Sequence, residues 1–203
     1  MRLYAATLLF ALTQVPASPV IDGRIGDEEW AGAERHALEG GGDLQLLRRG
    51  EDLFVAVRGA GPGLASLCVA AGTTVRILHA SAAVGEGAYV QQGTTDTWTK
   101  RADFDWAFRD SPRGAAPAED AKTAFFAKSG WLANASAAGS PDREFRIRAA
   151  GVESLAVTYL TVQGLSLAHW PPSVADDCKA VRIAQGFLPD TARFAPSGWH
   201  VIR

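Results

Sequence analysis

Short apolar runs separated by turn residues recur along this chain, and they constrain its fold more than any other feature. Two of them, Asp43–Arg49 and Leu53–Arg58, flank the polar turn Gly50–Asp52, a pattern typical of a β-hairpin. The 21 glycines and 10 prolines supply turns for many more short strands. We expect further strands at residues 67–69, 75–78, 88–92, 144–148, 155–162 and 198–202.

One of these stretches alternates between apolar and charged side chains with the period of a strand. We expect Phe145 and Ile147 to face the core, because successive side chains of a strand point to opposite faces. By the same alternation, Glu144, Arg146 and Arg148 are expected to face water.

Two short helices are expected beside the strands. Pro117 suits a first helical position, and Glu119 and Asp120 suit the positive N-terminal end of a helix. Gly130 is suited to end it, and a shorter helical turn is expected over Asp27–Ala33. Because strands dominate, we predict a mainly all-β fold, an immunoglobulin-like two-sheet antiparallel β-sandwich with one or two short helices.

The first residues have the pattern of an export signal. Arg2 gives a positive end, and Leu3–Leu12 is an apolar run shorter than the roughly 20 residues that span a membrane. Ala17 is a small residue at the expected cleavage position. We therefore expect residues 1–17 to be a secretory signal peptide, and residues 18–203 to be a single secreted or periplasmic domain without membrane association. A buried N-terminal strand or helix is the alternative.

Cys68 and Cys178 are the two cysteines of the chain, and neither belongs to a Cys-x-x-Cys motif. In an oxidising compartment they are expected to form a disulfide. Closing a loop of about 110 residues would stabilise the fold by roughly 4 kcal/mol in the chain-entropy model. Two separate buried thiols are the alternative.

The charge balance and the absence of catalytic motifs exclude several function classes. A net charge of −2 gives no basic field for nucleic acid. The chain contains no G-x-S-x-G, H-E-x-x-H or P-loop motif. His79 lies near Ser81, and His169 lies near Asp176 and Asp177, but neither group forms a recognised motif. We expect no catalysis, with an uncharacterised hydrolase-type enzyme as an alternative.

Aromatic and charged side chains alternate in the stretch between residues 96 and 110. In a strand, Phe104, Trp106 and Phe108 would share one face. Asp103, Asp105 and Arg109 would share the opposite face. An exposed aromatic strip could stack on sugar rings, whereas a buried strip is ordinary core. The core interpretation is favoured, because continuous exposed apolar area is rare.

Three further tryptophans have polar, glycine or proline neighbours that are typical of loops, so each is either a stacking platform or a lid over the core. Asp105 and Arg109 could hydrogen-bond to hydroxyl groups or form a solvated ion pair. The candidate ligand-binding residues are Trp98, Trp106, Trp131, Trp170, Asp105 and Arg109.

The start of the expected mature chain resembles a known family. The residues are Ile21-Asp22-Gly23, Asp27-Glu28-Glu29-Trp30 and Ala33, followed by Asp52-Leu53-Phe54-Val55-Ala56-Val57. They are similar to the opening of carbohydrate-binding module family 9 and of related DOMON-like domains. The resemblance implies a sandwich of two antiparallel sheets that binds a ligand, often a sugar, and it carries over no binding residues.

The same residues also have structural interpretations. Gly23 permits a tight turn, and Asp22 can bond to the backbone that follows it. Trp30 is expected to pack onto the sheet and close the end of the sandwich. The expected function is therefore non-catalytic binding of a saccharide by aromatic stacking and polar contacts. A secreted structural or protein-interaction domain, with a partner the sequence does not identify, is the alternative.

No cofactor is expected. Some DOMON-like domains hold haem through Met, but the only methionine here is Met1 in the expected leader, and the spacing of the four histidines does not indicate a two-histidine site. Asp103 with Asp105, and Asp176 with Asp177, offer oxygen ligands that suit calcium without forming an EF-hand loop. Calcium is the alternative, and turn-capping acids are favoured.

Overall fold

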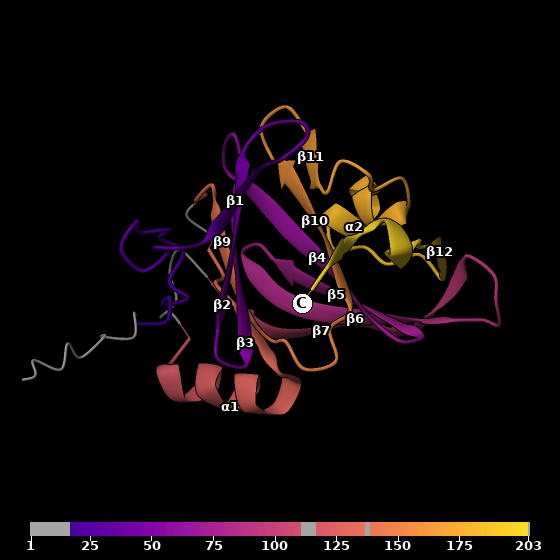
Figure 1. Cartoon of the computed structure of the whole chain (residues 1–203), viewed down its shortest axis with the longest axis horizontal. Helices are drawn as coiled ribbons and strands as arrows, with labels where there is room; N and C mark the ends of the chain where they lie inside the picture. Colours follow the sequence, from indigo (N-terminus) through magenta and orange to yellow (C-terminus); the bar gives the residue numbers. More distant parts are fainter. Residues whose placement is uncertain (1–16, 111–116, 137–138, 203) are drawn as a thin grey trace, which may run out of the picture.

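The computed structural model describes residues 17–110, 117–136 and 139–202, and it consists of two antiparallel sheets with two short helices (Figure 1). Five strands form sheet A in the order β1-β2-β3-β9-β8. They are β1 (Glu34–Ala37), β2 (Asp43–Arg49), β3 (Asp52–Arg58), β9 (Asp142–Arg148) and β8 (Trp131–Ala133). The expected signal peptide lies outside the described residues except for Ala17.

Eight strands form sheet B, which is curled (Figure 1). Its order is β11-β10-β4-β5-β6-β7-β12, and β13 pairs with β10. The strands are β4 (Gly63–Ala71), β5 (Thr74–Ala80), β6 (Ala83–Gln91), β7 (Thr97–Arg109), β10 (Ser154–Thr161), β11 (Ser166–Trp170), β12 (Thr191–Arg193) and β13 (His200–Val201). The prediction of a mainly-β fold with two antiparallel sheets is confirmed.

The strands expected from the sequence are present, although the one expected at residues 198–202 is only His200–Val201, and the structure adds others. The additional strands are β1, β8, β11 and β12, which have three to five residues each. Strands of this length are too short to show a period in the sequence. They form because a longer neighbour offers its free edge to them.

The expected helix is present as α1 (Glu119–Ser129), and Gly130 ends it in the left-handed conformation at φ 72°. The helical turn expected over Asp27–Ala33 is instead a series of hydrogen-bonded turns, so that prediction is corrected. A second short helix, α2 (Val181–Ala184), follows the 3₁₀ turn η1 (Asp177–Lys179), and another 3₁₀ turn, η2 (Pro196–Gly198), precedes β13.

The main core lies between the two sheets. Phe145 and Ile147 of β9 are fully buried in it, as predicted. Arg148 is exposed as predicted, whereas Arg146 is half-buried with its guanidinium 4.1 Å from the ring centre of Phe126. The prediction that Glu144 faces water is wrong, because another part of the chain covers its face of the sheet.

That covering part is residues 20–33, called here the N-terminal cover, which packs on the outer face of sheet A (left in Figure 1). Ile21 and Trp30 form a small cluster there with Phe54 of β3, and Trp30 has no exposed surface. Trp30 therefore packs onto the sheet as expected, but on an outer face rather than at the end of the sandwich.

Glu144 holds the N-terminal cover in place. Its Oε2 accepts hydrogen bonds from the backbone N–H groups of Asp22, Gly23 and Arg24 at 3.2, 2.6 and 3.2 Å, and its Oε1 accepts one from the indole of Trp30 at 3.1 Å. Burial raises the pKa of Glu144 to about 7, although the bonds from Gly23 and Trp30 oppose the shift. The Gly23 turn and Trp30 of the opening motif therefore share one buried acceptor, the carboxylate of Glu144.

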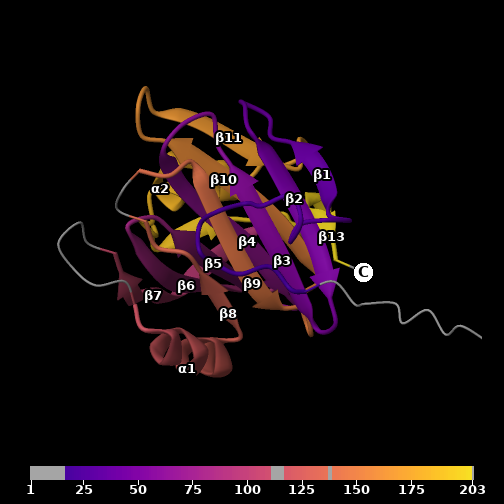
Figure 2. The same cartoon turned by 90° about the vertical axis from the view of Figure 1, so that its left-hand side faces the viewer.

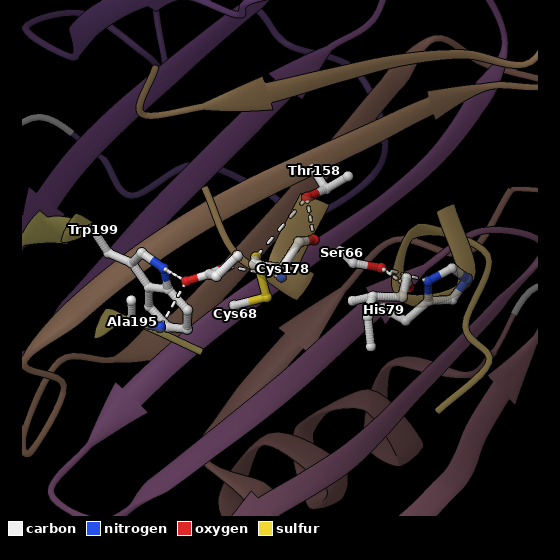
Figure 3. Close-up of a disulfide and its surroundings, with 9 residues drawn as sticks. Ser66, Cys68, His79, Thr158, Cys178, Ala195 and Trp199 are labelled. Atoms are coloured by element: carbon white, nitrogen blue, oxygen red, sulfur yellow. Dashed lines mark hydrogen bonds between the residues drawn. A yellow bond between two sulfur atoms is a disulfide. The ribbon is translucent and has the colours of Figure 1, made fainter. Parts of the chain in front are cut away.

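The outer face of sheet B is covered by residues 171–199, called here the C-terminal cover (right in Figure 1). Ile183, Phe194 and Trp199 pack in a second core against residues such as Ile77 and Tyr89 of the sheet. Asp176 organises this cover, because its carboxylate accepts hydrogen bonds from three N–H groups. They are the backbone N–H groups of Cys178 and Ala195 and the indole of Trp199, at 2.9, 2.8 and 2.7 Å (Figure 3).

The disulfide predicted between Cys68 and Cys178 is confirmed (Figure 3). It joins β4 of sheet B to η1 of the C-terminal cover, and both residues are fully buried. The hydroxyl of Thr158 on β10 donates to the carbonyl oxygen of Cys178 at 2.7 Å. The cover is therefore attached to the middle of the sheet by a covalent bond and a hydrogen bond.

Candidate functional site

Three of the candidate tryptophans lie below the surface. Trp98 is 2% exposed and donates its indole N–H to the carbonyl oxygen of Phe194 at 2.9 Å. Trp131 has no exposed surface, and Trp170 is 5% exposed. These rings belong to the core, which is the structural alternative given above for each of them.

Trp106 differs from them, because 38% of its surface is exposed. Its ring lies across Gly85 of β6, where an added Cβ would come within 2.7 Å of it. One neighbour is the ring of Phe104, stacked at 5.1 Å between centres, and another is the ring of His79 at 5.8 Å. The guanidinium carbon of Arg109 lies 5.8 Å from the centre of the ring, so two of the predicted site residues are adjacent.

The expected aromatic strip is interrupted by a bulge. Val84 of β6 pairs with Phe108, but the next residue, Gly85, pairs with Trp106, so β7 contains one extra residue at this point. Phe108 consequently packs against the core between the sheets, whereas Phe104 packs against the core under the C-terminal cover. The prediction that the three rings share one face is wrong.

A groove lies between residues of β5, β6 and β7 and residues of α1. The helix α1 lies below these strands in Figure 2. We call this groove the β7 groove, and its volume is about 430 Å³. Its lining residues are Arg76, Glu86, Gly87, Ala88, Ala102, Asp103, Asp105, Phe125, Lys128 and Ser129. Asp105 therefore lies in the groove, while its neighbour Trp106 faces the opposite side of the sheet.

An ion pair is held rigidly at the wall of the β7 groove. The guanidinium of Arg76 donates to both oxygens of Glu86, at 2.6 and 2.8 Å. Arg76 also donates to the carbonyl oxygen of Ser129 at the end of α1, and the indole of Trp131 donates to Glu86. Each partner is only about one quarter exposed, with side-chain values of 26% and 25%. This geometry fixes donors and acceptors before any ligand arrives.

The rim of the groove combines charge with one aromatic ring. Asp103 accepts a hydrogen bond from Lys100 at 3.2 Å, which lowers the pKa of Asp103. Asp105 and Lys128 are exposed at the same opening. Phe125 is anchored by edge-to-face contacts with two other rings, and Gly87, Ala88 and Ala102 leave the floor flat. The groove thus offers hydrogen-bonding groups, an apolar ring surface and space.

Arg76, Glu86 and Phe125 were not singled out from the sequence. Arg76 and Glu86 carry isolated opposite charges on two strands of one hairpin, ten positions apart. If the register of that hairpin were known, the two opposite charges on neighbouring strands would predict an ion pair between Arg76 and Glu86. Phe125 lies in α1, and the sequence does not indicate which part of the fold that helix faces.

The groups considered for catalysis do not assemble into a site. Ser66 is fully buried and donates its hydroxyl to the carbonyl oxygen of Ile183 at 3.0 Å, so His79 donates its Nδ1–H to Ser66 (Figure 3). Burial lowers the pKa of His79 to about 4, which keeps the ring neutral. The hydroxyl of Ser81 bonds to the backbone of Ala83, and Asp176 is occupied by the C-terminal cover.

Among the described residues, no group of three or more His, Cys, Asp or Glu side chains is placed to hold a metal ion. Asp176 and Asp177 accept backbone hydrogen bonds, as expected of turn-capping acids. None of the helices in the described parts of the chain has the length and apolar character needed to cross a bilayer.

A larger hollow of about 680 Å³ opens at the end of the sandwich beside β13. Its lining combines aliphatic and ring side chains, such as Leu46, Leu53 and Trp199, with the polar side chains of Glu34, Arg48, Ser173 and His200. We take the β7 groove as the candidate site for a polar ligand because its Arg76–Glu86 pair is held by two hydrogen bonds beside an aromatic ring.

Comparison of the chain with protein-family models, with curated proteins and with solved structures gave no match.

Proposed function

We propose that the chain is an exported, non-catalytic saccharide-binding domain, with an immunoglobulin-like sandwich similar to carbohydrate-binding module family 9 and DOMON-like domains. Its binding site is the β7 groove. The observation that carries the proposal is the Arg76–Glu86 pair, held in a two-point hydrogen-bonded geometry beside the ring of Phe125.

The chemistry of a sugar matches these groups. Neighbouring hydroxyls of a sugar ring both donate and accept hydrogen bonds, so a fixed guanidinium–carboxylate pair can satisfy them at once. The C–H face of the ring is apolar and packs on an aromatic side chain such as Phe125. Asp105 and Lys128 at the opening provide further partners for hydroxyl groups.

Other features support export and a binding role. A buried disulfide is typical of proteins that fold in an oxidising compartment. The opening motif is engaged with Glu144, so the residues that carry the family resemblance serve the scaffold. A specificity site on this scaffold would lie elsewhere, as the β7 groove does.

The test is calorimetric titration of the mature domain with a panel of soluble glycans. We expect one class to bind, and Asp105→Asn to weaken that binding about tenfold, since one good hydrogen bond to a charged group is worth that much. Lys122→Ala is the matched control, because Lys122 lies on α1 outside the groove and its loss should leave affinity unchanged. A folded protein that binds no member of the panel, or equal effects of both substitutions, contradicts the proposal.

A further inference from the structure

β7 is an edge strand along most of its length. One side pairs with β6, and the other pairs with β12 only from Thr97 to Thr99. The backbone N–H of Lys100 donates to the carbonyl oxygen of Asp190, and from residue 101 to residue 109 no strand of the described chain pairs on that side. Both surfaces of sheet B are therefore accessible from this one edge.

Two neighbouring side chains lie on either side of that edge. Asp105 lines the β7 groove, and Trp106 is exposed on the opposite surface of the sheet. Consecutive residues of a strand point to opposite faces, so only the thickness of the edge strand separates the groove from the ring. A ligand that leaves the groove past Asp105 meets Trp106 next.

The ring of Trp106 is a fixed surface rather than a loose side chain. It contacts the rings of Phe104 and His79, and a Cβ at Gly186 would lie 3.3 Å from its Cη2. Phe187, the residue after Gly186, is 66% exposed. Arg109 adds a hydrogen-bond donor beside the ring.

We propose that the ligand is an extended glycan chain that crosses the β7 edge, with some sugar units in the β7 groove and the following units stacked on Trp106. The proposal rests on the saccharide-binding function proposed above, and it specifies the substrate class as a polymer segment rather than a monosaccharide or disaccharide. The observation behind it is that Asp105, which lines the groove, and Trp106, which is exposed on the opposite surface, are neighbours on one edge strand.

Linked subsites have a measurable signature. A short saccharide fills the groove and gains nothing from Trp106. Once the chain is long enough to reach the ring, the second contact becomes intramolecular and affinity rises steeply. Stacking on an exposed tryptophan uses the apolar C–H face that many sugar rings share, so this subsite should respond to chain length more than to sugar identity.

The experiment titrates the domain with cello-, malto- and chito-oligosaccharides of increasing length, from disaccharide to hexasaccharide. In the series that binds, we expect the hexasaccharide to bind at least about tenfold more tightly than the disaccharide. Trp106→Ala should reduce the hexasaccharide affinity to that of the disaccharide and leave the disaccharide unchanged, whereas Trp106→Phe should retain most of the gain. Arg109→Ala gives an independent, smaller loss for the hexasaccharide only, and circular dichroism verifies that each variant is folded.

The outcomes separate this proposal from the one on which it rests. Suppose that disaccharides bind, that Asp105→Asn weakens their binding, and that affinity does not rise with chain length. The proposal of a saccharide site in the β7 groove is then supported, and the proposal that the glycan crosses the β7 edge is overturned. If the length gain persists in Trp106→Ala, the chain leaves the groove by another route and the proposal is again overturned. If no series binds to the folded domain, both proposals fail.

Discussion

The N-terminal cover and the C-terminal cover each bury a tryptophan whose indole N–H donates to a carboxylate, Glu144 for Trp30 and Asp176 for Trp199. Each carboxylate also collects backbone N–H groups of its cover. The two carboxylates nevertheless sit on opposite partners of the contact. Glu144 belongs to the sheet and reaches out to the cover, whereas Asp176 belongs to the cover and organises it from within.

The covers also differ in how they are attached to the sheet. The N-terminal cover is held by hydrogen bonds and a small apolar cluster, and the C-terminal cover has in addition the disulfide between Cys68 and Cys178. One network of N–H donors is therefore enough to hold a short cover on its sheet. A cover of nearly thirty residues with little regular structure of its own loses more conformational entropy on folding, so a covalent attachment stabilises it further. The predictions below test that difference.

The largest effect is expected from replacing both Cys68 and Cys178 by serine. A loop closed over 110 residues stabilises a fold by about 4 kcal/mol in the chain-entropy model. Urea denaturation of the variant should show that loss, and hydrogen exchange should increase first in the C-terminal cover. Reduction of the wild-type protein under mild denaturation is the control. A loss below about 1 kcal/mol would show that packing alone attaches the cover.

Glu144→Ala is expected to cost about 3 kcal/mol, because it leaves the indole of Trp30 and three backbone N–H groups without their buried acceptor. Asp176→Ala is the matched variant on the other cover. It removes the same kinds of bonds, but the disulfide retains the segment, so we expect a smaller loss of about 1–2 kcal/mol. Equal losses, measured by denaturant titration, would remove the distinction between the two attachments.

The last prediction concerns pH, whose effect on stability has opposite signs in the two covers. Burial raises the pKa of Glu144 from its ordinary value of 4.5 to about 7, so the folded state favours the protonated carboxyl group, and this contribution to stability is lost as pH rises through that range. The pKa of His79, under α2, is lowered from 6.5 to about 4, so its contribution is present above pH 6.5 and lost as pH falls.

Amide hydrogen exchange, corrected for its intrinsic pH dependence, checks these signs. Protection at Gly23 and Arg24 should decrease from pH 5 to pH 8, and protection around Ile183 should decrease from pH 7 to pH 4.5. Glu144→Gln should abolish the first trend and preserve the second. Two trends of the same sign would mean that global stability, rather than these two groups, controls both covers.

Much of the framework follows from local sequence pattern. The hairpin of β2 and β3, the alternation of Phe145 and Ile147, and the end of α1 at Gly130 are set by periods and turn residues that act over a few positions. The Cys68–Cys178 pair followed from the expected compartment and the cysteine count. Each of these inferences needs no knowledge of distant contacts.

The errors have a common physical origin in contacts between distant segments. Glu144 has the pattern of a solvent-facing residue, and only the docking of residues 20–33 buries it. The extra residue in β7 becomes visible only in its pairing with β6, and it sends Phe108 to the other face. Trp98 and Trp131 have the neighbours of loop residues, yet each lies in a strand, 2% and 0% exposed.

The irregular pairing of β6 with β7 has a further consequence for how molecules of this protein meet each other. Three register shifts interrupt this pair, and charged side chains such as Arg101, Asp103 and Asp105 line the open strand. A strand from a second molecule would find no straight ladder of hydrogen bonds along this edge, and it would meet charged side chains there. The distortion therefore protects the free edge against edge-to-edge aggregation while leaving it open to other ligands.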